Sequence, residues 1–194
     1  MPGRVVIALV VAGVAVLGAG AWLWLGRDAP RPAAFHGTPT SAMYAPVDSR
    51  ADDAAPLTTG ELFRAGALGE LARGEVEELA DCDDALWGAA APGCTQALRA
   101  TYTGGAVAGQ FVIFNLPDGR AADALVTALR RDGFVRQAVP FDPARSRAEV
   151  RALGHYVTVS WVGARGTADA DLVPPLIALD SLGQAIQSRV LAAT

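Results

Sequence analysis

The stretch ALRATYTGGAVAGQFVIFNLPDGRAADALVTALRR, residues 97–131, contains the clearest signals for the fold. Ala97–Thr103 and Gln110–Leu116 are apolar runs rich in residues that favour strands, and the segment between them has the glycines that a hairpin loop needs. Pro117-Asp118 ends the second run and precedes alanines and leucines at helical spacing. The stretch therefore predicts two antiparallel strands followed by a helix.

The C-terminal third repeats this alternation of strands and helices. Phe134–Val139 predicts one more strand, and Ala148–Ala152 with His155–Val162 predicts a second hairpin about Leu153-Gly154. The tail predicts a helix with one apolar stripe, formed by Leu172, Leu176, Leu179, Ile186 and Val190. The order β-β-α-β-β-β-α predicts an α+β domain, a ferredoxin-like antiparallel sheet with helices on one face.

The segment ELFRAGALGELARGEVEEL, residues 61–79, gives a weaker signal. Three glycines interrupt any helix, and no regular alternation of apolar and polar residues replaces the helical pattern. We predict short helical pieces here.

An uncharged apolar run, Val5–Leu25, lies near the N-terminus. Its 21 residues would extend about 31 Å as a helix, close to the hydrocarbon thickness of a bilayer. Ala19-Gly20-Ala21 offers a signal-peptidase site, but the run continues past it to Trp22 and Trp24, which favours a retained anchor. A cleaved signal peptide and a buried core helix are the alternatives. We predict a signal anchor or transmembrane helix over residues 1–26 that contacts the lipid bilayer through residues 5–25.

Residues 27–57 are rich in proline and have no amphipathic period. They contain five of the 12 prolines, and this composition predicts a flexible linker. Residues 58–194 then form the folded domain. Because only about four residues precede the apolar run, the simple signal-anchor topology places this domain outside the cytoplasm, with the chain crossing the cell membrane once.

The chain has two cysteines, Cys82 and Cys94. Their spacing does not fit a C-x-x-C redox motif, and two thiolates are too few for a structural zinc site. An even pair in an extracytoplasmic domain predicts a disulfide, with free thiols and a metal or catalytic pair as the alternatives. The neighbouring aspartates lack the glycine and glutamate that follow in an EF-hand loop, so we predict no metal site there.

His155 is the one histidine in a predicted strand, since His36 lies in the predicted linker. No nucleophile, base or metal motif of a known catalytic kind accompanies it. A structural histidine is the main interpretation, and a ligand of haem or of another small molecule is the alternative. We predict no cofactor and no enzymatic activity.

Six arginines crowd the segment between the predicted helix and the last hairpin. We predict that they contact an anionic surface, either a lipid or a cell-wall polyanion. The alternative is that they pair with the acidic half of the same domain. The six are Arg130, Arg131, Arg136, Arg145, Arg147 and Arg151. We expect no nucleic-acid partner, because the chain is acidic, with a pI of about 5.1, and is predicted to lie outside the cell.

Four short stretches, DCDDALWG, GCTQALRATYT, FVIFNL and LGHYVTVSWV, together resemble an uncharacterised group of actinobacterial single-pass membrane proteins. The resemblance covers roughly residues 81–163 and the anchor. It implies a membrane location and a bacterial lineage, but no activity and no site residues. The sequence as a whole predicts a membrane-anchored, extracytoplasmic binding or interaction domain of the cell envelope that is not catalytic, with an envelope protein or a polyanion as the candidate partner. A small-ligand or haem-binding domain and an envelope enzyme are the alternatives.

Overall fold

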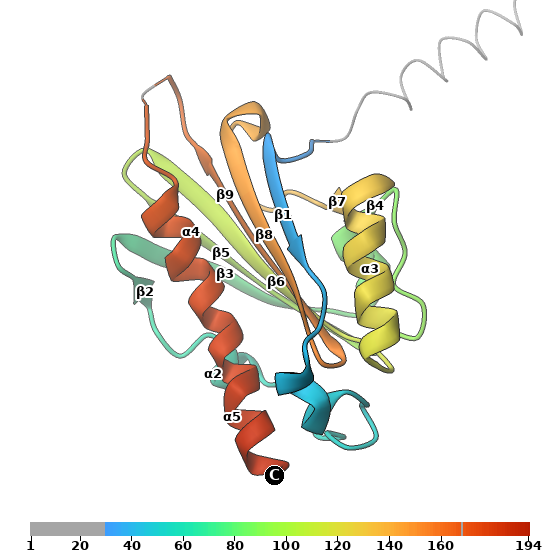
Figure 1. Ribbon diagram of the computed structural model, residues 1–194. Coiled ribbons are helices and arrows are strands. Elements are labelled where there is room, and N and C mark those ends of the chain that lie inside the picture. The colour runs from blue at the N-terminus through green and yellow to red at the C-terminus, as the bar shows by residue number, and fades with distance from the viewer. Residues whose placement is uncertain (1–29, 168) are drawn as a thin grey trace, which may run out of the picture.

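The computed structural model describes residues 30–167 and 169–194 (Figure 1). The apolar run that predicts a membrane anchor, residues 5–25, lies outside these residues. Within the described ranges, no helix is both long enough and apolar enough to cross a bilayer.

The domain is built on a seven-stranded sheet with the order β1-β8-β9-β6-β5-β3-β2. β1 runs parallel to β8, and every other neighbouring pair is antiparallel. The strands are β1 (Ala34–Thr38), β2 (Ala67–Leu68), β3 (Leu71–Leu79), β5 (Gln96–Gly104), β6 (Val107–Asn115), β8 (Ser146–Leu153) and β9 (Tyr156–Ala164). A separate two-stranded ladder pairs β4 (Leu86–Trp87) with β7 (Phe134–Val135).

Helices cover both faces of the sheet. α3 (Gly119–Arg131) packs on one face with the β4–β7 ladder, and α4 (Val173–Asp180) and α5 (Gln184–Ala192) belong to the core on the other face (Figure 1). The shorter helices are α2 (Thr59–Leu62) and the 3-10 turns η1 (Ala42–Val47), η2 (Cys82–Ala85), η3 (Pro143–Arg145) and η4 (Ser181–Gly183).

The predicted ferredoxin-like α+β fold, with an antiparallel sheet and helices on one face, is therefore wrong. The protein is mostly sheet, the sheet is mixed and curled, and it is covered on both sides. The reason lies in the central strands. All nine residues of β9 are buried, with Val159 and Trp161 in one core and Tyr156 and Val162 in the other. A strand buried on both faces requires a layer of cover on each.

The predicted Pro-rich stalk is also wrong from residue 30 onward. β1 pairs with the whole of β8 except its ends, and Phe35 stacks edge-to-face on Phe134 at 5.9 Å between ring centroids. Arg31 donates to the carbonyl oxygens of Leu129, at 2.9 Å, and Arg130. These carbonyls belong to the unpaired end of α3, where a cation is favourable. Long-range contacts, which local composition does not reveal, order this segment.

The helical pieces predicted for residues 61–79 are replaced mainly by strand. Only α2 is helical there, and β3 occupies Leu71–Leu79 with a bulge between Arg73 and Val76. β3 lies near the edge of the sheet, where charged residues discourage pairing between molecules. These charged residues replace the alternation of apolar and polar residues that would predict a strand.

The stretch at residues 97–131 folds as predicted. β5 and β6 form an antiparallel hairpin, and α3 follows directly. The Asp118 side chain accepts a hydrogen bond from the backbone nitrogen of Ala121 at 2.8 Å and so caps the helix. The predicted hairpin of β8 and β9 and the helical tail are confirmed as well.

Candidate functional site

The two cysteines form a disulfide, as predicted. Cys82, in η2, is bonded to Cys94, which precedes β5. The aspartates beside Cys82 have structural roles: Asp81 accepts the backbone N–H of Asp83, and Asp83 accepts that of Ala91, each at 2.9 Å. Among the described residues, no group of three or more histidine, cysteine, aspartate or glutamate side chains is arranged to hold a metal ion.

Trp87 lies within the loop that this disulfide closes. Its backbone pairs with Phe134 in the β4–β7 ladder, and Arg136 extends the ladder by donating its N–H to the carbonyl of Ala85 at 2.7 Å. Phe134 is fully buried and stacks edge-to-face on Trp161 at 5.0 Å between centroids. The ladder therefore ties Trp87 to the core through its pairing partner.

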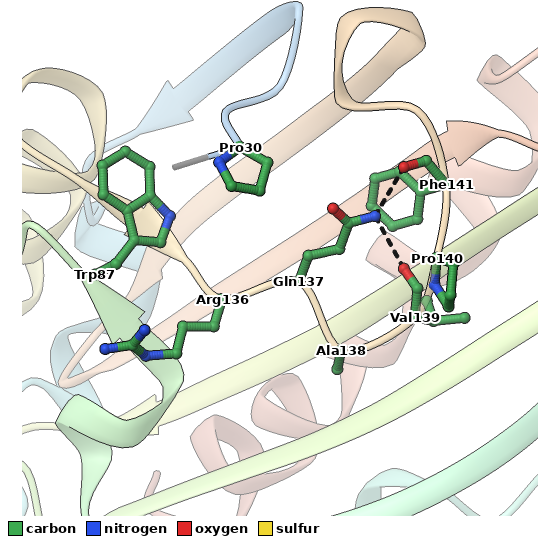
Figure 2. Close-up of a pocket in the computed structure, with 8 residues that line it drawn as sticks. All are labelled: Pro30, Trp87, Arg136, Gln137, Ala138, Val139, Pro140 and Phe141. Atoms are coloured by element: carbon green, nitrogen blue, oxygen red, sulfur yellow. Dashed lines mark hydrogen bonds between the residues drawn. The ribbon is translucent and has the colours of Figure 1, made fainter. Parts of the chain in front are cut away.

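An open hollow of about 620 Å³ lies beside Trp87. Figure 2 shows Trp87 and Arg136 on one side, Val139, Pro140 and Phe141 on the other, and Gln137 between them. Pro30 closes the rim near the start of the described chain. The hollow thus has an aromatic and cationic side and an apolar side.

Two glutamine amides fix the loop that forms the apolar side. Gln137 Nε2 donates to the carbonyls of Val139, at 3.0 Å, and Phe141, at 2.9 Å (Figure 2). Gln110, fully buried on β6, accepts from the Ala138 nitrogen at 2.6 Å and donates to the Arg136 carbonyl at 2.9 Å. The amide groups hold an irregular segment in one shape without a helix or strand.

Positive charge gathers around the aromatic side of this hollow. The Arg31 guanidinium lies 5.9 Å from the Trp87 ring centroid, within cation–π range. Arg131 and Arg136 are exposed, and neither has an ion-pair partner among the described residues. The buried Trp87 indole nitrogen likewise has no hydrogen-bond acceptor there. Arg136, which lines the hollow, is therefore an exposed cation next to a space that a ligand can enter.

The six arginines predicted to contact an anionic surface do not share one face. Arg130, Arg131 and Arg136 lie at the end of α3 and just after β7, whereas Arg147 and Arg151 lie on β8, and Arg145 ends η3. Alternation along β8 directs Arg147 and Arg151 away from the α3 face, because Ala148 and Val150 belong to the core under α3.

Three of the six arginines have partners within the domain. Arg151 pairs with Asp180 at 2.9 Å and with Glu149 at 3.1 Å. Arg130 donates to the carbonyl of Gly37 at 2.9 Å, and Arg145 donates to that of Gly166 at 2.8 Å. Of the arginines without such a partner, Arg136 lines the hollow.

His155 lies in the packed interior and does not line the hollow. Its imidazole is fully buried and lies 3.9 Å from the Tyr156 ring between centroids. Nδ1 is 2.7 Å from the Val47 carbonyl oxygen, which also accepts the His155 backbone N–H. Burial lowers the pKa of His155, so the neutral form is favoured. The arrangement suits a structural histidine.

A second polar cluster, absent from the sequence-based expectations, surrounds Arg189 on α5. Arg189 donates to Asp53 at 2.8 Å and to Glu61 at 2.9 Å, and the Tyr156 hydroxyl donates to Asp53 at 2.8 Å. Burial raises the pKa of Tyr156, and the Glu61 hydrogen bond raises that of Arg189. Its members come from residues far apart in the chain, so spacing along the sequence gives no signal for it.

Comparisons with protein-family models, curated proteins and solved structures found no match to this chain. The resemblance to actinobacterial single-pass membrane proteins therefore stays a prediction. Of the residues that line the hollow, only Arg136 was among the predicted site residues. Pro30 lies in the predicted linker, and Trp87 was not among the predicted site residues.

Proposed function

We propose that this chain is a membrane-anchored, extracytoplasmic binding domain of a bacterial cell envelope that acts by binding and not by catalysis. The Cys82–Cys94 disulfide is the observation that carries the proposal. Structural disulfides form and persist outside the reducing cytosol. The uncharged run Val5–Leu25 precedes the domain and is long enough to anchor it.

The hollow beside Trp87 is the candidate binding site of this domain. It combines an aromatic ring, the exposed guanidinium of Arg136 and an apolar wall, the mixture of groups that fixes and orients ligands in many binding sites. Two ionisable groups elsewhere in the interior are engaged by protein partners: His155, through Nδ1, by Val47, and Arg189 by Asp53 and Glu61. This distribution of partners favours binding over proton transfer or nucleophilic attack.

Cysteine labelling of intact bacteria that express the full chain tests both the topology and the disulfide. A maleimide that cannot cross the membrane is added with and without a reductant that is also excluded from the cytosol. We expect labelling only after reduction, because the two thiols are then released outside the cell. Labelling that requires lysis and no reductant would contradict the proposal.

Two controls complete the test. The Cys82→Ser/Cys94→Ser double variant leaves no cysteine in the chain, so any labelling of it measures background. A second variant of that cysteine-free chain, with Gly3→Cys, carries a single thiol before the apolar run. It is expected to label only after lysis. Labelling of this thiol in intact cells would indicate the opposite orientation.

A further inference from the structure

We propose that the hollow beside Trp87 binds the phosphate of an anionic phospholipid headgroup. This inference rests on the proposed function, because it takes residues 5–25 to be the membrane anchor. The position, the charge and the shape of the hollow support it.

The position follows from the length of the connecting chain. Pro30 lines the hollow and follows Leu25, the end of the apolar run, by five positions. Five residues span at most about 17 Å when fully extended. The rim of the hollow must therefore lie within about that distance of the point where the chain leaves the hydrocarbon layer. The headgroup region extends roughly 5–8 Å beyond that layer, so a lipid headgroup is within reach.

The charge of the surrounding surface favours an anion. Between Arg130 and Phe141 the chain has three arginines and one acid, Asp132. Arg31 adds a fourth guanidinium above Trp87. Arginines placed within a Debye length of a membrane attract anionic lipid, with about 1 kcal/mol for each residue near the surface.

The remaining donors suit a phosphate more than a diffuse charge. The guanidinium of Arg136 has no ion-pair partner among the residues described, and a guanidinium can hold two phosphate oxygens at once. Trp87 contributes its ring to the wall of the hollow, with the Arg31 guanidinium 5.9 Å from the ring centroid. Indole rings are enriched at headgroup depth, where the ring contacts apolar groups and the N–H finds a polar partner.

The opposite wall of the hollow fits the start of an acyl chain. Val139, Pro140 and Phe141 present apolar surface across from Arg136 (Figure 2). Because the Gln137 amide is bonded to the carbonyls of Val139 and Phe141, that polar group does not need the ligand as a partner. A headgroup phosphate with a few methylenes attached matches a site with cations on one side and apolar groups on the other.

The experiment measures lipid binding by the full chain in a non-ionic detergent, with native mass spectrometry of the lipid-bound and lipid-free protein. The probes are phosphatidylglycerol, phosphatidylcholine and inorganic phosphate. Wild-type protein and Arg136→Gln are mixed in equal amounts, so both compete for the same lipid. We expect one saturable phosphatidylglycerol site that Arg136→Gln weakens roughly tenfold or more, the effect of removing a charged hydrogen bond. Trp87→Leu, which removes the aromatic ring from the wall of the hollow, is expected to weaken it by about two- to tenfold.

Arg147→Gln is the matched control. Arg147 is also an exposed arginine, but it lies on β8, on the face opposite α3, and its replacement is expected to leave lipid binding unchanged. Circular dichroism of each variant confirms that it folds.

Four results would overturn the proposal: no saturable lipid binding, equal binding of phosphatidylcholine, equal losses in Arg136→Gln and Arg147→Gln, or inorganic phosphate that binds as tightly as the lipid. The last result would indicate a free-phosphate site. Orientation in the membrane plays no part in the detergent experiment. Its failure is therefore distinguishable from failure of the cysteine-labelling test, which concerns topology alone.

Discussion

The guanidinium of Arg189 donates to both carboxylate oxygens of Glu61, each at 2.9 Å, across 128 positions of the chain. This two-point contact joins α5, near the end of the described chain, to α2. Arg189 also donates to Asp53 and to the backbone carbonyls of Ala55 and Pro56. One side chain therefore holds the segment that precedes α2 against the C-terminal helix.

Replacing Arg189 by Gln is expected to lower the free energy of unfolding by about 3 kcal/mol. The change leaves the carboxylate of Asp53, which is 12% exposed, without its cation, and breaking a buried ion pair typically costs 3–5 kcal/mol. The expected loss lies at the lower end of this range because the Glu61 side chain is 25% exposed and regains some hydration. For a domain of this size the melting temperature should fall by roughly 6–12 °C, measured by circular dichroism.

Arg64→Gln is the control for this prediction. Arg64 is exposed and, within the part of the chain that the structure describes, donates only to the carbonyl of Gly60, so its loss is expected to shift the melting temperature by little. Equal shifts in the Arg64 and Arg189 variants would show that the contacts of Arg189 do not stabilise the fold.

Stability is expected to decrease as the pH falls from about 7.5 to 5.5, in part because of His155. Burial lowers the pKa of this histidine below its ordinary value of 6.5, although the Val47 hydrogen bond opposes the shift. The unfolded chain then takes up a proton near pH 6.5 that the folded chain does not. The stabilisation is present above pH 6.5 and is lost as the pH falls toward the lowered pKa.

Melting temperatures of wild-type protein and His155→Gln between pH 7.5 and 5.5 measure this contribution. We expect the variant to lose less stability over this interval than the wild type, whatever its stability at pH 7.5. An unchanged pH dependence in His155→Gln would mean that His155 is not its source.

Loss of the Cys82–Cys94 disulfide is expected to lower the free energy of unfolding by about 3 kcal/mol. The bond joins residues separated by 12 positions, and the chain-entropy model assigns about this value to a loop of that length. Trp87 lies within the loop, so lipid binding should weaken as well. Melting of the Cys82→Ser/Cys94→Ser variant, compared with oxidised wild-type protein, measures the first effect, and wild-type protein in reductant should melt like the variant. A variant as stable as the oxidised wild type would contradict it.

The sequence predicted the parts of the fold that are stabilised by neighbours along the chain. The β5–β6 hairpin has its own glycine loop, α3 has an Asp118 cap and an apolar stripe, and β8 and β9 join across a tight turn at Gly154. Each of these signals acts within a few residues, so one sequence is enough to find it.

The parts that were missed depend on distant partners. β1 has no strong propensity of its own, but it pairs with β8 more than a hundred positions away and is clamped by Arg31 at the end of α3. The hollow beside Trp87 was missed for the same reason. Its walls come from Pro30, Trp87 and residues 136–141, and only the tertiary fold brings these together. Spacing rules gave no sign of this juxtaposition.

Gly133 provides the sharpest test of how Trp87 is positioned. A Cβ atom at this glycine would lie 2.0 Å from the Trp87 carbonyl oxygen and 2.5 Å from the backbone nitrogen of Ala89. Both obstacles are backbone atoms, so side-chain rotation cannot relieve the clash, and β4 would have to move away from β7. Gly133→Ala is expected to lower the free energy of unfolding by about 2–3 kcal/mol, the upper part of the range for overpacking.

Gly60→Ala is the matched control, because a Cβ at Gly60, in α2, meets nothing within 4 Å. There the change should be neutral or stabilise by up to about 1 kcal/mol, since alanine favours the helix. Chemical unfolding gives both values. Lipid binding gives a second readout: Gly133→Ala should weaken it, because Trp87 shifts with β4, while Gly60→Ala should not. If Gly133→Ala matched the control in both measurements, the close approach of the two strands would not be what holds Trp87 at the hollow.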